Sequence, residues 1–409
     1  MWIVILGMVA VYAIALALSY DRKRIKYRIV LTAFALQAFI AFFALNVPAG
    51  QAAMGALTQG VHLLFEHAEA GISFIFGPLA GESMGFVFFV KVLPVIVFIS
   101  SLTAVLYHLN VMQWIVLVIG GGLRRIVGVT KVESLCTASN IFLGQTESPL
   151  AIRPYLPSLT PSQLFTVMTT GLASVSGTIL VGYAALGIEL KYLITAAFMA
   201  APGGLLMAKT IFPDEEDTPD DENLLDANIQ SDGRRAANVF EAAAEGAGTG
   251  LMLAANIGAM LLAFIALISL LNGIIGGVGG WFGFADLTFE QILGVTFAPL
   301  MYLLGVPWAE AISAGNLVGQ KLILNEFIAY VSLSEIKDTL SPHAQAVITF
   351  ALCGFANFSS LAIQLGGLGI LVPERRAEIA QLGLRAIFAG ALANLMSAAL
   401  ASFALLAAA

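Results

Sequence analysis

Two glutamates stand out in a chain that is otherwise poor in charge: Glu147 in GQTESPL and Glu326 in LNEFIAY. Each lies in a segment interrupted by Gly, Pro and polar residues, the first over 131–160 and the second over 305–335. Carboxylates accept hydrogen bonds from vicinal hydroxyls, whereas amides and hydroxyls can bind the edge of a heterocycle. The spans that follow supply such groups: Ser174, Ser176 and Thr178 after the first segment, and Asn357, Ser359 and Ser360 after the second. These residue types suit a neutral, polyhydroxylated solute.

The composition places these residues in a membrane. Of 409 residues, 59% are hydrophobic and 11% are charged, whereas soluble chains have about 45–50% apolar and about 25% charged residues. This shortage of charge excludes a soluble enzyme, a nucleic-acid-binding protein and a disordered chain. We therefore expect an integral protein of the lipid bilayer with many spans and no nucleic-acid partner.

The net charge of −7 has a local origin. The segment 214–226 (DEEDTPDDENLLD) holds 8 of the 26 acidic residues, and such a run is typical of a solvated loop. The cysteines, Cys136 and Cys353, form no CxxC motif, and the four histidines lack zinc-ligand spacing. The sequence thus indicates neither a disulfide framework nor a metal site built from these residues.

Eight stretches are apolar and about 20 residues long, as a bilayer-spanning helix requires. They are Trp2–Tyr20, Ile29–Val47, Met84–Leu106, Leu164–Leu186, Tyr192–Met207, Gly250–Leu271, Ala344–Leu371 and Ile379–Ala409. Three further stretches, 51–76, 111–127 and 288–304, mix apolar and polar residues and are predicted to be amphipathic helices in the interface.

Lysine and arginine placement predicts the orientation. The cluster 22–28 places the first loop in the cytoplasm, and alternation puts most other basic residues on the same side: Arg124, Arg125, Lys131, Lys209, Arg234, Arg235, Arg375 and Arg376. Both termini are then periplasmic. This alternation holds only if 131–160 and 305–335 each enter and leave the membrane on one side, as re-entrant hairpins do.

The two hairpin segments also resemble each other. Asn140 precedes Gly144-Gln145 in the first, and Asn316 precedes Gly319-Gln320 in the second. A span broken by small and polar residues follows each one, with GLASVSGT at 171–178 and CGFANFSS at 353–360. Paired interrupted segments at matching positions are typical of transporters built from inverted repeats.

The predicted fold is therefore an all-α membrane protein with eight transmembrane helices, two re-entrant helical hairpins and interfacial helices. Residues 1–130 supply scaffold and interfacial helices, and 131–210 form the first inverted repeat. Residues 211–304 contain the acidic cytoplasmic loop, a scaffold helix and an external interfacial helix. Residues 305–409 form the second repeat.

Other ionisable residues lie inside apolar or hairpin segments: Lys91, Arg153 and Lys321. One interpretation pairs both glutamates with Arg153 and Lys321 as structural ion pairs. The other leaves the carboxylates free to bind a solute in a cavity near the bilayer midplane. For Lys91, which is close to Pro94 in an apolar span, we favour a structural role.

The motifs GQTESPL at 144–150, NEFIAY at 325–330 and CGFANFSS at 353–360, in this order within paired hairpins, resemble those of the concentrative nucleoside transporter family. The similarity covers essentially the whole chain, and the length resembles that of bacterial members. It implies a homotrimer in the bacterial inner membrane that couples the uptake of nucleosides such as uridine, adenosine or cytidine to a cation gradient. In such a protein a hairpin-bearing transport domain moves against a trimeric scaffold.

The resemblance also implies roles for individual residues. Matching positions that would contact the nucleobase are Gln145, Thr146 and Glu147. Those that would hold the ribose hydroxyls are Glu326, Asn357 and Ser360, and Phe355 would line the pocket. The family's sodium site maps onto the side chains of Asn140 and Ser174 and the carbonyls of Leu143 and Val175, with Ser176 as an alternative to Ser174.

Alternatives remain at this point. Asn140 and Ser174 would be purely structural if Asn140 capped the following helix and Ser174 bonded back to its own helix. The coupling ion would be a proton if Glu147 or Glu326 carried it. A membrane-embedded enzyme would need a nucleophile or metal ligands near the carboxylates, which the sequence lacks. Two closed hairpins favour alternating access over a passive channel. The sequence contains no P-loop, the motif that would indicate coupling to ATP.

Overall fold

The computed structural model describes residues 1–81, 87–215, 236–284 and 286–408, and every regular element in these ranges is a helix. Residues 84–86 of the third predicted span, residues 216–226 of the acidic run and Ala409 lie outside the described residues. The predicted all-α class is confirmed.

Each of the eight stretches predicted as spans contains one or two helices. In chain order they are α1 (Trp2–Ala17), α2 (Tyr27–Asn46), α4 (Phe88–Lys91) with α5 (Leu93–His108), α8 (Pro161–Ala173) with α9 (Gly177–Ala185), α10 (Leu190–Ile211), α11 (Val239–Gly280), α15 (Pro342–Leu352) with α16 (Ser359–Leu371), and α17 (Arg376–Ala408). By length and composition, 6 of the described helices can cross a membrane, and all of them lie in these stretches. The other two stretches hold α1, which has 16 residues, and the interrupted pair α15–α16.

The remaining helices lie where interfacial helices and hairpins are predicted. The three interfacial stretches contain α3 (Pro48–Phe76), α6 (Val111–Val127) and α12 (Phe289–Leu303). The first hairpin consists of α7 (Lys131–Ser139) and the 3-10 helix η4 (Ser148–Ser158), and the second of α13 (Trp308–Ile323) and α14 (Glu326–Ile336). Between α12 and α13 the chain bends by 117°, so the two do not form one straight span.

Helix ends in these segments are specified by capping side chains. Thr130 and Glu133 form a capping box at the start of α7, and Thr160 and Gln163 form one at the start of α8. Asn325 accepts a hydrogen bond from the Ile328 amide at 2.9 Å and so begins α14. Such caps satisfy amide groups that a helix start leaves without intrahelical partners. Local sequence therefore fixes where the hairpin helices begin.

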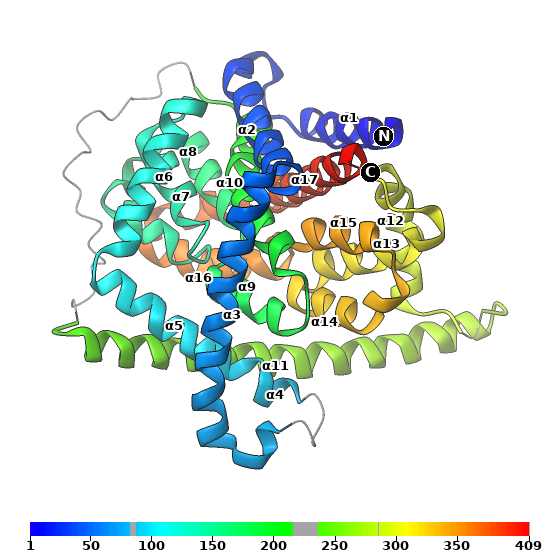
Figure 1. Cartoon of the computed structure of the whole chain (residues 1–409). Coiled ribbons are helices and arrows are strands. Elements are labelled where there is room, and N and C mark those ends of the chain that lie inside the picture. Colours follow the sequence, from blue (N-terminus) through cyan, green and yellow to red (C-terminus); the bar gives the residue numbers. More distant parts are fainter. Residues whose placement is uncertain (82–86, 216–235, 285, 409) are drawn as a thin grey trace.

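Most of the buried core comes from the helices of the two repeats, with smaller contributions from α1, α2 and α5. The apolar window of α8–α9 is 89% buried and that of α10 is 83% buried, whereas that of α11 is 17% buried. In Figure 1, α11 runs along the outside of the molecule, where it packs on α5. A Cβ on Gly246 would lie 2.5 Å from the Ala104 Cβ, so glycine permits this close approach. The two ends of the chain lie beside each other (Figure 1).

Candidate functional site

Each hairpin tip is hydrogen-bonded to the break in the span that follows it. In the first repeat the Gly177 amide donates to the Phe142 carbonyl at 2.9 Å, and in the second the Phe358 amide donates to the Leu322 carbonyl at 3.1 Å. Backbone groups freed where helices break are thus satisfied by the hairpins, as non-helical backbone at membrane depth requires. The two repeats therefore share the same hydrogen-bonding arrangement between hairpin tip and helix break.

The two breaks also meet each other. The Phe355 amide in the second break donates to the Ser174 carbonyl in the first at 3.1 Å. Thr146, at the first hairpin tip, packs against Gly367 of α16, where a Cβ would come within 2.6 Å of the threonine methyl. Both hairpin tips and both breaks therefore converge on one region inside the protein.

Glu326 is the centre of a hydrogen-bonded group in the second repeat. Its side chain is 6% exposed, and its oxygens accept from the Tyr183 hydroxyl at 3.1 Å and from the Asn357 amide at 2.9 Å. The Asn357 oxygen in turn accepts from the backbone amide of Ser360 at 2.9 Å and from its hydroxyl at 3.0 Å. The structure thus brings together Glu326, Asn357 and Ser360, as predicted from the motifs, and adds Tyr183 of α9.

The polar residues of the first hairpin tip are less completely bonded. Gln145 is 7% exposed, and its side-chain oxygen has no hydrogen-bond partner among the described residues. Glu147 is exposed and accepts from the Gly144 amide at 3.4 Å. An unpartnered buried acceptor costs free energy until something donates to it. Gln145 is therefore a position where a bound molecule could donate a hydrogen bond.

Gln364 of α16 has the same property and was not predicted. Its amide nitrogen donates to the Met168 carbonyl at 2.9 Å, while its buried oxygen has no partner among the described residues. It lies one helical turn after Ser360, and residues four apart share a helix face. That spacing was the available signal in the sequence.

The candidate cation ligands lie between the first hairpin tip and the first break. Asn140 is buried, donates to the Thr170 hydroxyl at 3.2 Å, and accepts a hydrogen bond from the Ser148 hydroxyl. The carbonyls of Leu143 and Val175 accept no hydrogen bond from any residue that the structure describes. Oxygen atoms without hydrogen-bond partners at a helix break are suitable ligands for a small cation.

The structural alternative holds for Ser174 and does not hold for Asn140. Ser174 does bond back to its own helix, because its hydroxyl donates to the Gly171 carbonyl at 3.3 Å. Asn140 does not cap a following helix and instead bridges α8 and the start of η4. Ser176, the alternative ligand, caps α9 by accepting from the Ile179 amide at 3.3 Å.

The alternative interpretation, in which Glu326 pairs with Lys321, does not hold among the described residues. The Lys321 ammonium donates to the Ala351 carbonyl at 2.8 Å and to the Asn394 side chain at 2.7 Å, and no salt bridge joins it to Glu326. Glu326 is held by uncharged donors instead, so its carboxylate stays available to another partner. Lys91 bonds to the Ala80 carbonyl, in keeping with the structural role favoured for it.

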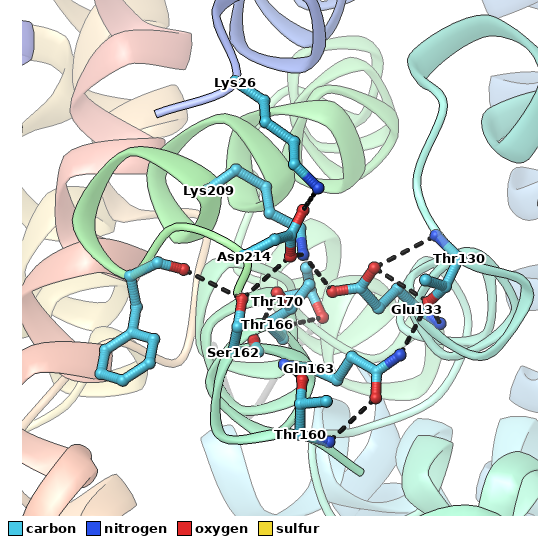
Figure 2. A network of polar contacts seen from close by, with 11 residues as sticks. Lys26, Thr130, Glu133, Thr160, Ser162, Gln163, Thr166, Thr170, Lys209 and Asp214 are labelled. Carbon is cyan, nitrogen blue, oxygen red and sulfur yellow. Dashed lines mark hydrogen bonds and ion pairs between the residues drawn. The ribbon is translucent and has the colours of Figure 1, made fainter. Parts of the chain in front are cut away.

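A buried ion cluster anchors the base of the first hairpin (Figure 2). Lys209, at the end of α10, donates to the carboxylates of Glu133 in α7 and of Asp214. Lys26 lies 3.5 Å from the Asp214 carboxylate, and Ser162 of α8 donates to it at 3.0 Å. Burial opposes ionisation, but the Lys209 and Lys26 ammonium groups and the Ser162 hydroxyl keep the pKa of Asp214 below its ordinary value of 3.8. The carboxylate is therefore ionised at neutral pH and pairs with Lys209.

This cluster corrects one prediction. Asp214 is the first residue of the acidic run, for which a solvated loop was predicted, yet it is only 8% exposed. The reason is its pairing with the buried ammonium of Lys209, a residue whose sequence position indicates only the orientation of the chain. A buried charge is tolerated when it is paired and hydrogen-bonded.

Family models match most of the chain. The model described as Na+ dependent nucleoside transporter N-terminus matches residues 6–79, and the C-terminus model of that name matches residues 192–402. A model described as nucleoside recognition matches residues 89–189 between them.

Curated relatives and solved structures agree with these matches. The chain is 43% identical over 408 residues to the nucleoside permease NupC of Helicobacter pylori, covering 97% of this chain and 96% of the relative. It is 51% identical over 399 residues to the uncharacterized transporter YutK of Bacillus subtilis, covering 97% and 98%. The structure of CNTnw in an inward-facing, substrate-bound state is 48% identical, with a TM-score of 0.94 over 100% of this chain and 99% of that one. A CNTnw variant in an outward-facing state also gives a TM-score of 0.94, at 46% identity over 100% and 98% of the two chains.

Two hairpins and two broken helices that converge on buried polar residues define a membrane transporter rather than an enzyme. The chain belongs to the concentrative nucleoside transporter family, and it is a nucleoside transporter of that fold.

Proposed function

We propose that the chain is a symporter that imports nucleosides down a sodium gradient by alternating access. The observation that carries this proposal is the contact between the first hairpin tip and the first break. There, uncharged oxygen atoms without hydrogen-bond partners lie beside the polar residues of the tip. A cation bound among them would hold the tip next to Gln145, Thr146 and Glu147. Ion and nucleoside would then favour the same arrangement of the hairpin.

The nucleoside would bind between the two hairpin tips. Glu326, Asn357 and Ser360, already joined by hydrogen bonds, would bind the ribose hydroxyls, because a carboxylate accepts from both members of a vicinal pair. Gln145, Thr146 and Glu147 would bind the base. The side-chain oxygen of Gln145, which has no partner in the described residues, would accept from a base amino or imino group. Phe355, which is half-buried at the second break, would line the pocket.

Sodium would take its ligands from Asn140, Ser174, Leu143 and Val175. These residues offer an amide oxygen, a hydroxyl and two backbone carbonyls, and none of them is a carboxylate. A neutral ligand set binds a monovalent ion weakly, which suits an ion that must be released inside the cell. The name of one relative, the human sodium/nucleoside cotransporter 1, which is 36% identical over 410 residues, supports the choice of sodium.

The hairpins, broken helices and α10 and α17 would form the moving domain, and the α5–α11 pair would belong to the stationary scaffold of a homotrimer. The burial of α11, 17% in its apolar window against 83% for α10, supports this division. The site of action would be the bacterial inner membrane. Both termini would be periplasmic. Val4, near the start of the chain, and Ser402, near its end, both lie next to Gly305, which agrees with the two termini lying on one side of the membrane.

A proton-coupled nucleoside symporter is the second candidate. Glu147 and Glu326 are both held by uncharged donors in the hydrogen bonds that the structure describes, and either carboxylate could take up a proton. Ion pairs would oppose such protonation.

Uptake of labelled uridine into proteoliposomes, with sodium and proton gradients imposed separately, tests the proposal. We expect the sodium gradient alone to drive accumulation. Uptake that follows only the proton gradient would reject sodium coupling and transfer the role to a glutamate.

Nucleoside affinity at fixed pH then tests the ion ligands. In the parent protein, sodium and uridine should each raise the affinity for the other by the same factor. Asn140→Ala and Ser174→Ala should weaken this dependence on sodium, whereas Ser158→Ala, at an exposed position of the same hairpin, should not. Unchanged sodium dependence in both site variants would remove them from the ion site.

A further inference from the structure

Lys321 places a buried ammonium group at the ends of broken helices. Its side chain is 3% exposed and donates to the Ala351 carbonyl at 2.8 Å, in the last turn of α15. It also donates to the side-chain oxygen of Asn394 on α17 at 2.7 Å. Carbonyls at the end of a helix carry partial negative charge, and a cation there is stabilised.

Asn394 extends this contact to the first repeat. Its amide group donates to the Ala173 carbonyl at 2.6 Å, at the end of α8, and to the Cys353 carbonyl at 2.7 Å, just after α15. Gly354 leaves the room that this requires, because a Cβ there would lie 2.1 Å from the asparagine oxygen. Lys321 and Asn394 thus bind carbonyls at the ends of both interrupted helices.

The ammonium has no carboxylate within salt-bridge distance among the residues that the structure describes. The Glu326 carboxylate is bonded to Tyr183 and Asn357 instead. The oxygens bonded to the ammonium are one backbone carbonyl and one asparagine amide oxygen. A buried charge held only by neutral oxygens at a helix break is in the environment that a small coupling cation takes in transporters.

The corresponding place in the first repeat is the candidate sodium site. Asn140 directly follows α7, the first helix of its hairpin, and Lys321 lies in the last turn of α13, the first helix of the other. Each of the two faces the break in the following span. One repeat offers an asparagine oxygen and unbonded carbonyls, whereas the other offers an asparagine oxygen and a carbonyl that already hold a positive charge.

We infer that the Lys321 ammonium is a tethered cation, which takes in the second repeat the place that the coupling sodium takes in the first. The transporter then needs one sodium ion per nucleoside, because its second cation is part of the chain. This inference deepens the proposed sodium coupling and rests on it for the ion count, but the role of the ammonium can be tested without sodium.

The ion count is measured on the parent protein. Radioactive sodium and tritiated uridine are taken up by the same proteoliposomes at zero membrane potential, and the initial rates are compared. We expect one sodium ion per uridine. A ratio of two would overturn the inference. Absence of uridine-dependent sodium uptake would instead reject the sodium coupling proposed above, leaving the decision on Lys321 to the binding measurement.

The binding measurement uses purified Lys321→Ala and Lys321→Met. Loss of a charged hydrogen-bond donor should weaken uridine binding roughly 10-fold to 150-fold in both variants. Methylammonium, or a raised sodium concentration, should restore binding in Lys321→Ala, where the vacated space can hold a cation, and not in Lys321→Met, where the side chain fills it. The Hill coefficient for sodium should rise toward two in Lys321→Ala alone.

Lys337→Ala is the matched control, because Lys337, which directly follows the second hairpin, also donates to a backbone carbonyl, that of Gly187 at 3.1 Å, but at the surface. It should bind uridine as the parent does. If Lys321→Ala stays folded by size-exclusion chromatography and neither methylammonium nor sodium restores binding, Lys321 is a structural residue and the inference is overturned. If both variants fail to fold, the ion count of the parent decides.

Discussion

Glu326 begins α14 with one carboxylate oxygen bonded to a phenol and the other to an amide. This arrangement orients the group without neutralising it, since neither donor is charged. A carboxylate that is held in this way keeps unused lone pairs for a ligand. At the scale of single residues, the proposed ribose site depends on this bonding.

Glu326→Gln should therefore weaken uridine binding. A hydrogen bond to a charged group contributes about 1.5–3 kcal/mol, which corresponds to a loss of roughly 10-fold to 150-fold in affinity. The preference for ribosides over deoxyribosides should narrow as well. Isothermal titration of both ligands measures the two effects.

Glu335→Gln is the control for this variant, because Glu335 lies on the same helix and is exposed. It should leave both affinities unchanged. Uridine affinity that is the same in Glu326→Gln as in the parent would exclude the carboxylate from the site.

The residues with unusual types for a membrane segment were predictable, and those with ordinary types were not. Glu326, Asn357 and Ser360 belong to polar motifs that interrupt apolar runs, so they can be recognised in the sequence. Tyr183 reaches Glu326 over 143 residues of chain from an apolar helix, where a tyrosine gives no signal. The side-chain contacts of Asn394 likewise depend on tertiary packing that no local pattern encodes.

Among the secondary-structure elements, the topology of the first hairpin can be tested by cysteine labelling. Both of its ends should face the cytoplasm if residues 131–160 re-enter the membrane. Arg125, at the end of α6, and Ser158, at the end of η4, are exposed, whereas Lys131 is buried. Single cysteines at positions 125 and 158, in a background without Cys136 and Cys353, should both react with an impermeant maleimide in inside-out vesicles only.

Labelling of the two positions from opposite faces would make the segment a true span and would contradict the inverted-repeat arrangement. The control is a cysteine in place of Trp281, an exposed residue that directly follows α11. It should react from the other side in right-side-out vesicles.

The ion cluster at the base of the same hairpin should be important for stability. Lys209→Met removes the ammonium shared by Glu133 and Asp214 and leaves two carboxylates buried without it. Breaking a buried pair from one side costs about 3–5 kcal/mol. We expect a clear fall in the unfolding temperature of the detergent-purified protein, measured by intrinsic fluorescence.

Lys191→Met on the same helix is the comparison. Lys191 pairs with Glu189 at 3.7 Å, but both side chains are more than half exposed, and such pairs contribute about 0–1 kcal/mol. Equal unfolding temperatures in the two variants would mean that the buried cluster adds no more than a surface pair.

The order of elements was predictable because each hairpin and each break has a local cause. Glycines, prolines and capping residues mark them in the chain, and Thr130, Thr160, Ser176 and Asn325 are used as caps in the structure. The ion cluster was not predictable, because Glu133 and Lys209 are 76 residues apart and meet only through packing. Periodicity does not report such contacts.

At the scale of the whole molecule, α11 lies along the outside of the core and exposes large apolar side chains on its length: Leu251, Met252, Leu262, Ile265, Leu267 and Leu270. Part of this surface faces lipid in any arrangement. In a closed assembly, the rest would pack against another copy, as symmetric oligomers require. We expect the protein in mild detergent to be a trimer by native mass spectrometry. A monomer that retains uridine binding would contradict this expectation.

The hydrogen bonds of Asn394 have a consequence for biosynthesis. This residue lies on α17, which the ribosome synthesises after both interrupted helices, and it binds carbonyls that precede it by 221 and 41 residues. Until α17 inserts, those carbonyls lack their partner inside the bilayer, where unsatisfied polar groups are expensive. Neither half can therefore mature on its own as it leaves the translocon. A nascent chain arrested before residue 394 would stay incompletely folded and open to membrane quality-control proteases.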